Sequence, residues 1–89
     1  MDQVLILKFL KKENTINPNL ALDKTAIMPN VKGMTDYKFQ FNISALELVG
    51  FVKRNVTKRP NRFYITGDGR KALALYEQSV REELEAVNS

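Results

Sequence analysis

The 89-residue sequence contains no cysteine, no histidine and no tryptophan. Without cysteine the chain can form neither disulfides nor thiolate metal sites. Without histidine it lacks the usual general base at neutral pH and the commonest metal ligand. Its ten acidic residues are scattered, and four of them fall within the last thirteen positions. We therefore expect neither an enzyme nor a metal or cofactor site.

Long apolar runs are also missing. No stretch approaches the roughly 20 residues that a membrane span requires, and the first residues show no signal-peptide pattern. We expect a protein without membrane contact that acts in the cytoplasm, and on the nucleoid if its source is prokaryotic. The composition, 44% hydrophobic and 27% charged, is ordinary for a folded chain. Its length predicts a single domain over residues 1–89.

The most informative stretch is a basic segment over residues 50–73, GFVKRNVTKRPNRFYITGDGRKAL. Two short runs rich in β-branched and aromatic side chains, residues 51–55 and 62–66, flank a turn-prone segment with Pro60. This pattern predicts a β-hairpin over residues 51–66. The cations of the hairpin are Lys53, Arg54, Lys58, Arg59 and Arg62, and no acidic residue lies between Leu48 and Gly67.

Five cations on one two-stranded ribbon repel each other, whereas a polyanion neutralises them and releases its own counterions. The hairpin therefore indicates nucleic acid as a partner. The alternative is that its Lys and Pro residues protect an exposed edge against strand-to-strand aggregation. Gly67 and Gly69 have a Gly-x-Gly spacing, but no Lys-Ser or Lys-Thr pair follows them, so we expect no nucleotide site.

Charge is distributed unevenly along the chain. Residues 77–89 hold four glutamates and one arginine, a local charge of −3, so the remainder carries +7 within the net charge of +4. This asymmetry favours a basic binding face with an acidic end turned away from it. A mixed, solvated surface is the alternative.

The expected helices span residues 2–12, 19–28, 35–49 and 68–87. The first has Asp2 as a cap and lysines in its last turn. The second has a weaker apolar pattern and should stop before Pro29. The third begins at a Thr35 cap and ends before Gly50. The fourth follows the hairpin after a cap at Thr66.

The third helix is apolar on two sides. Phe39, Ile43 and Leu46 suit a core stripe at helical spacing. The second face consists of Tyr37, Phe41, Ala45 and Leu48. Such a helix is either deeply buried or places its second face on a partner. The alternation of aromatic residues from position 37 to 41 also permits a strand.

The fourth helix contains a narrow apolar seam close to a heptad pattern, formed by Leu73, Tyr76, Val80, Leu84 and Val87. The seam extends far beyond the hairpin. It can pack on the first helix of the same chain or pair with a second chain. We expect these five residues to form a homodimer interface.

The order helix, helix, helix, basic hairpin, helix is that of a winged helix-turn-helix domain. The segment LELVGFVKR, residues 46–54, resembles the end of a recognition helix running into the first wing strand. The segment FYITGDGRKAL, residues 63–73, resembles the second wing strand and following helix of MarR- and PadR-type regulators. The resemblance implies a mostly helical α+β fold: a three-helix bundle, a two-stranded wing and a C-terminal helix. Winged helices also occur in protein-binding modules, so fold does not decide function.

The resemblance also assigns roles to residues. The positions that match the DNA-facing side of the recognition helix are Thr35, Tyr37, Lys38, Gln40, Phe41 and Ser44. Gln40 suits a contact to adenine, and Lys38 suits phosphate or guanine. The wing residues Lys53, Arg54, Lys58, Arg59 and Arg62 would lie near the adjacent backbone or minor groove, with Arg59 at the tip. Asn42 departs from the family, which usually has an apolar residue there.

Two functions follow as hypotheses. The first is a small transcriptional regulator that binds double-stranded DNA as a homodimer through the wing and the third helix. The second is a protein-interaction module that uses the aromatic face of the third helix, because Tyr37 and Phe41 are unusual on a DNA-facing side.

Overall fold

The computed structural model describes residues 2–13, 15, 17–57 and 59–88. Its helices are α1 (Asp2–Lys12), α2 (Lys24–Ile27), α3 (Asp36–Leu48) and α4 (Gly67–Asn88). Its strands are β1 (Leu22–Asp23), β2 (Val52–Asn55) and β3 (Arg62–Ile65). Two short 3-10 helices, η1 (Pro18–Leu20) and η2 (Met28–Asn30), flank β1 and α2. The fold is mostly helical.

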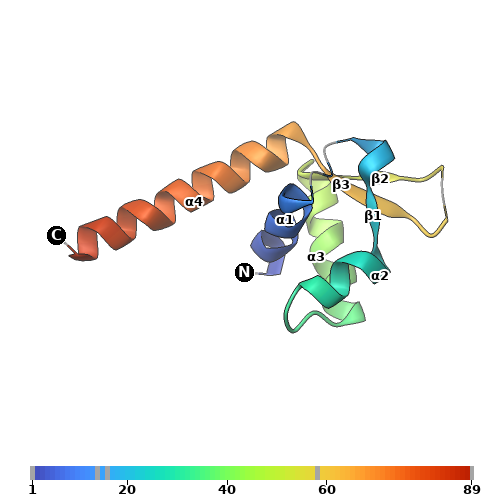
Figure 1. The fold of residues 1–89 in the computed structure, drawn as a ribbon, viewed down its shortest axis with the longest axis horizontal. Coiled ribbons are helices and arrows are strands. Elements are labelled where there is room, and N and C mark those ends of the chain that lie inside the picture. The colour runs from blue at the N-terminus through green and yellow to red at the C-terminus, as the bar shows by residue number, and fades with distance from the viewer. Residues whose placement is uncertain (1, 14, 16, 58, 89) are drawn as a thin grey trace.

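The three strands form one antiparallel sheet in the order β1-β3-β2. Val52 of β2 lies opposite Ile65 of β3, and Leu22 of β1 lies opposite Phe63. We expected two strands; the third, β1, is only two residues long and pairs with a segment about forty positions away. The hairpin of β2 and β3 extends to one side of the molecule, while α4 extends to the other (Figure 1).

A single core joins the helices to the sheet. Among the described residues it consists of Ile6, Leu7, Leu10, Ile27, Val31, Phe39, Ile43, Leu46, Val52, Phe63, Ile65 and Leu73. The three α3 residues expected in the core are each 1% exposed or less. The rings of Phe39 and Phe63 meet edge to face, with centroids 5.6 Å apart, which joins α3 to the sheet. Buried Thr15 accepts a hydrogen bond from the Ile65 amide at its carbonyl, at 2.9 Å.

The predicted second helix over residues 19–28 is wrong in its extent. Only Lys24–Ile27 is α-helical, and the segment before it forms η1 and β1. Asp23 has an extended backbone and its carboxylate accepts a hydrogen bond from the Ala26 amide at 2.9 Å. An aspartate satisfies the free amides at a helix start, so it favours the cap position over the helix interior. Asn17 caps η1 in the same way.

The end of α3 has the hydrogen bonds of a Schellman motif. The Phe51 amide donates to the Leu46 carbonyl and the Gly50 amide donates to the Glu47 carbonyl. Gly50 has a φ of 81°, which a residue without Cβ adopts at little cost. The chain therefore leaves α3 in a fixed direction and enters β2 after one further residue.

The junction between β3 and α4 rests on Thr66. Its hydroxyl donates to the Gly50 carbonyl at 2.6 Å and accepts from the Gly69 amide at 3.0 Å. Its backbone amide donates to the Phe51 carbonyl at 2.9 Å. Thr66 thus caps α4, as expected from the sequence, and also connects α4 to the end of α3.

Of the glycines at this junction, Gly69 should tolerate substitution least. A Cβ at position 69 would collide with the Phe51 carbonyl oxygen and lie 2.9 Å from Ile65 Cγ1, whereas one at Gly67 would meet nothing within 4 Å. We expect Gly69→Ala to lower the free energy of unfolding by about 2 kcal/mol. Gly67→Ala, the matched control, should leave it unchanged or raise it by about 0.5 kcal/mol. Urea denaturation followed by circular dichroism measures both; equal effects would contradict the close packing at Gly69.

Candidate nucleic-acid interface

The face of α3 opposite the core is exposed and apolar. Tyr37 is 78% exposed, Phe41 64% and Leu48 88%. Together with Gln40, Ser44 and Ala45 they line one shallow groove. Of the two readings open for this helix, deep burial is therefore wrong. The aromatic residues divide between the two sides, since Phe39 is fully buried.

Polar and charged side chains surround this apolar face. Thr35, Lys38, Gln40 and Ser44 are all exposed. The Thr35 hydroxyl accepts a hydrogen bond from the Lys38 amide at 3.2 Å and so caps α3. Lys38 is the one cation within α3. Asp36, in the first turn of α3, forms an ion pair with Lys24 of α2, whose Nζ lies 2.9 Å from the Asp36 carboxylate. The groove side of α3 therefore presents little positive charge.

Asn42, the departure from the resemblance, is buried at 8% exposure. Its amide Nδ2 donates to the Lys38 carbonyl at 2.8 Å. A hydrogen bond to the helix's own backbone satisfies this donor, which explains how a polar residue occupies a position at the core boundary.

Among the described residues of the wing, two cations are exposed and form no ion pair. Lys53 and Arg59 are exposed, and neither has an acidic partner within ion-pair distance in the described part of the chain. Lys58, the third cation expected there, lies outside the described residues. Exposed, unpaired cations retain their charge for an external anion.

Arg54, by contrast, is compensated within the chain. Its guanidinium Nη2 donates to the Glu47 carboxylate of α3 at 2.7 Å. The same guanidinium lies over the Phe63 ring, 5.1 Å from its centroid. Our expectation of five uncompensated cations is therefore wrong for Arg54. The sequence pattern missed Glu47 because it lies outside the hairpin and reaches Arg54 only through the fold.

Arg62 is half-buried at the base of the wing. In the strand register it lies opposite Asp23 of β1. The Thr25 hydroxyl and then the Ala26 amide hold the pKa of the Asp23 carboxyl below its ordinary value, and the charge of Arg62 lowers this pKa further. Arg62 therefore lies beside an anion of its own chain.

Asn55 anchors the wing to the N-terminal half of the chain. Its Nδ2 donates to the Pro18 carbonyl at 3.0 Å, and its Oδ1 accepts from the Thr57 amide and hydroxyl. Because Pro18 and Asn55 are 37 positions apart, no local pattern in the sequence points to this contact.

The expected dimer seam divides into two parts. Leu73 is 1% exposed and belongs to the core, so its assignment to a dimer interface is wrong: it packs within its own chain. Tyr76 is half-buried beside Val4 and Leu7 of α1. Exposure then rises along the seam, from 37% at Val80 to 58% at Leu84 and 82% at Val87. Packing within the same chain therefore holds for the start of the seam, and pairing of its exposed part with a second chain stays a prediction.

The described residues hold neither a metal-binding cluster nor a membrane-spanning helix. No group of three or more acidic side chains there is arranged to hold a metal ion. None of the helices, within the same residues, combines the length and hydropathy needed to span a membrane.

Comparison with protein-family models gave no match, and a search of curated proteins gave none either. Among solved structures, the chain is similar to TubR from Bacillus megaterium pBM400, with a TM-score of 0.76 and 20% sequence identity. The alignment covers 82% of this chain and 80% of that one. This likeness confirms the winged-helix fold. It does not distinguish the MarR or PadR type from other winged helices.

Arg54 should contribute to stability rather than to an external contact. We expect Arg54→Ala to lower the free energy of unfolding by about 1–2 kcal/mol, because it removes the Glu47 ion pair and the stacking on Phe63. Lys53→Ala, a neighbouring control on the exposed side of β2, should change it by less than about 0.5 kcal/mol. Urea denaturation compares the two variants. If Arg54→Ala is as stable as the parent protein, Arg54 does not contribute to the stability of the fold.

Proposed function

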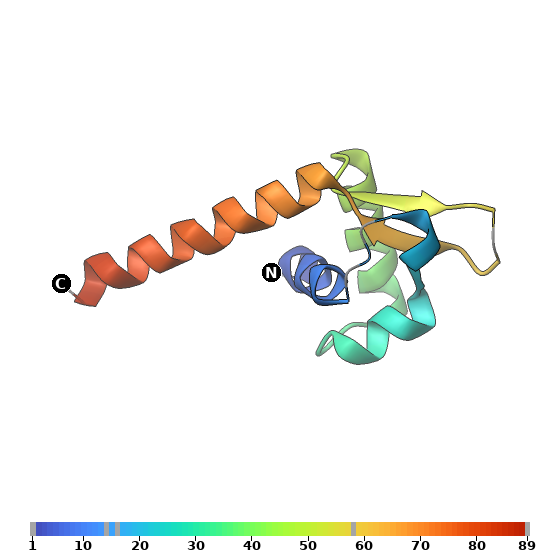
Figure 2. The same cartoon turned by 45° about the horizontal axis from the view of Figure 1, so that its top comes forward.

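We propose that this winged-helix protein binds double-stranded DNA as a small transcriptional regulator. The observation that supports the proposal best is the wing, where Lys53 and Arg59 are exposed and unpaired on a hairpin that extends away from the domain body (Figure 2). Lys58 adds a third cation to the same sequence segment. Such charges bind phosphates through counterion release, which requires no particular base sequence.

The third helix supplies the polar contacts of this proposal. Thr35, Lys38, Gln40 and Ser44 lie on its exposed side, where amide and hydroxyl groups reach base edges and phosphates in a major groove. Arg59, at the tip, is the residue we assign to the minor groove or adjacent backbone. Because α3 contributes only one cation, we expect the wing to dominate affinity and α3 to supply a modest preference among sequences.

We propose further that the protein acts as a homodimer through the exposed part of α4, including Val80, Leu84 and Val87. A ten-kilodalton domain with few base-reading side chains gains affinity when two copies bind together, since phosphate contacts double. The apolar side chains along α4 favour burial against another chain.

The proposal predicts DNA binding that weakens steeply with salt. Fluorescence anisotropy of a labelled random-sequence duplex, between about 50 and about 200 mM salt, gives the slope of log affinity against log salt. We expect Arg59→Ala and Lys53→Ala each to reduce this slope by about one, equally for all sequences. Lys11→Ala on α1 removes the same charge away from the wing and is the control.

Failure of the parent protein to bind at low salt would overturn the DNA proposal. If Arg59→Ala and Lys53→Ala bind the duplex with the affinity and salt slope of the parent, DNA remains the partner but the wing is not the contact.

A second candidate function is supported by the apolar face of α3. Tyr37, Phe41 and Leu48 are mostly exposed, and the groove that they line has no charged residue. Base edges and phosphates offer polar partners, so an aromatic and aliphatic surface of this kind fits a protein better. In this second function the protein is an interaction module, and α3 binds a partner protein.

The double variant Tyr37→Ala/Phe41→Ala distinguishes the two functions. If the face contacts DNA, this variant should weaken duplex binding by about tenfold while leaving the salt slope unchanged, because no cation is lost. If the face contacts protein, duplex affinity should equal that of the parent. The same anisotropy titration gives both answers, with Gln40→Ala as the control for a polar base contact.

A further inference from the structure

One row of side chains on α3 is both apolar and largely exposed. Tyr37 and Phe41 lie one helical turn apart, and Leu48 follows on the same side of the helix. Gln40, Ser44 and Ala45 complete the shallow groove along this row, and none of these six residues is charged. Apolar surface of this kind is more stable when a partner covers it than when it faces water.

Both acidic residues of α3 are neutralised by cations of the same chain. Asp36 pairs with Lys24 of α2 at 2.9 Å. Glu47 pairs with Arg54 of β2 at 2.7 Å. Lys38 has no acidic partner in the described part of the chain. A phosphate backbone requires nearby carboxylates to be neutralised, since like charges repel each other, whereas an apolar protein partner does not. The charge balance of α3 therefore favours a duplex.

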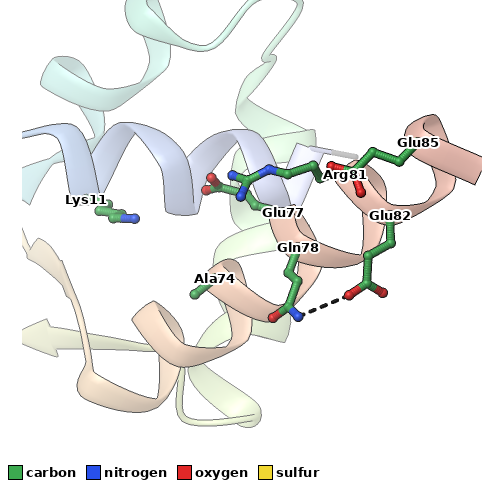
Figure 3. A pocket seen from close by; sticks show the side chains of 7 residues that line it. All are labelled: Lys11, Ala74, Glu77, Gln78, Arg81, Glu82 and Glu85. Atoms are coloured by element: carbon green, nitrogen blue, oxygen red, sulfur yellow. Dashed lines mark hydrogen bonds between the residues drawn. The ribbon is translucent and has the colours of Figure 1, made fainter. Parts of the chain in front are cut away.

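The groove between α1 and α4 has the opposite charge balance. Figure 3 shows Lys11 projecting from α1, with Glu77 and Arg81 on α4. Glu82 and Glu85 line the same groove, so it has three carboxylates and two cations. A polyanion is not attracted to such a surface. Of these two grooves, the one along α3 is therefore the one that can approach DNA.

The base edges of the major groove are polar with one exception, the C5 methyl group of thymine. Adenine, the partner of thymine, presents an acceptor and a donor that a glutamine side chain can contact together. The groove along α3 offers a counterpart to both, because Gln40 lies there with Tyr37 and Phe41. Its composition therefore matches an A·T pair.

We propose that Tyr37 and Phe41 contact the C5 methyl groups of thymines in the major groove, so that α3 selects thymine-containing sites. This inference rests on the DNA binding proposed above and identifies what α3 recognises. Recognition helices contact base edges with their N-terminal residues, and both aromatic side chains lie in the first two turns of α3. Leu48 lies at the other end of α3 and is not part of the contact.

The spacing of the two rings agrees with the spacing of bases along a strand. Side chains four residues apart on a helix have Cβ atoms about 5–6 Å apart, and successive bases of one strand rise by about 3.4 Å. With α3 lying along the groove, Tyr37 and Phe41 therefore reach thymines about two base steps apart. Removing each methyl group from water should raise the affinity by about fourfold.

Replacing thymine by uracil removes this methyl group alone and tests the proposal on the full chain. Uracil keeps the O4 acceptor of the major groove and the O2 acceptor of the minor groove, so the polar groups that the wing meets are unchanged. Fluorescence anisotropy compares a labelled duplex of alternating A·T pairs, whose thymines are two steps apart on each strand, with the same duplex built from A·U pairs. The parent protein should bind the A·T duplex about tenfold more tightly. This ratio should be equal at about 50 and about 200 mM salt, because the methyl group carries no charge.

Variants of α3 assign the ratio to individual side chains. Tyr37→Ala/Phe41→Ala should bind both duplexes equally, and each single variant should retain a ratio of about four. Leu48→Ala, the matched control on the same face of α3, should keep the tenfold ratio of the parent. Arg59→Ala should weaken binding to both duplexes alike and leave the ratio unchanged, because its contact is to the backbone or minor groove. Circular dichroism confirms that each variant is folded.

Three outcomes would overturn the inference, and each has a different meaning. Equal, salt-dependent binding of both duplexes by the parent retains DNA as the partner and leaves the apolar face of α3 to a protein. A tenfold ratio that persists in Tyr37→Ala/Phe41→Ala assigns the difference to the shape of the duplex instead of these two residues. Binding of neither duplex at low salt means that the DNA proposal itself fails, and the thymine contact fails with it.

Discussion

The hydrogen bonds of one residue, Thr66, connect α3, the wing and α4. Through its hydroxyl the end of α3, at Gly50, is joined to the start of α4, at Gly69. Through its amide the same residue holds the entry to β2 at Phe51. Thr66 therefore helps to fix both the direction of the wing and the direction of α4 relative to α3. Displacing Thr66 would change the position of both relative to α3.

Much of the fold follows from local chemistry that the sequence displays. The cap at Thr35, the glycine at position 50 and the cap at Thr66 are short-range signals, and each marks a boundary in the structure. The segment around β1 was mispredicted because its strand is two residues long and is stabilised by pairing with distant β3. Apolar periodicity there suggested a helix, but the capping preference of Asp23 and the pairing with β3 outweighed it.

The site was less predictable than the fold, because charge balance depends on contacts between distant residues. The sequence shows that Arg54 lies in a basic hairpin, yet its partner Glu47 belongs to another element. The contact of Asn55 with Pro18 is equally remote. The exposure of the second face of α3 was predictable only as a pair of alternatives, since an apolar second face does not reveal whether the core covers it too. Phe39 was expected in the core, whereas the core position of Leu73 became clear only once the packing was known.

The placement of the wing and the acidic end of α4 on opposite sides of the molecule has an electrical consequence. The longest dimension is 50 Å, whereas the Debye length at physiological ionic strength is about 8 Å. The two ends are therefore screened from each other, and a polyanion within about one Debye length of the molecule meets the local charge of the nearer end and not the net charge of +4. At that range the basic end is attracted and the acidic end is repelled. The isoelectric point reflects only the net charge, so it does not show that the separated charges can orient the protein before contact.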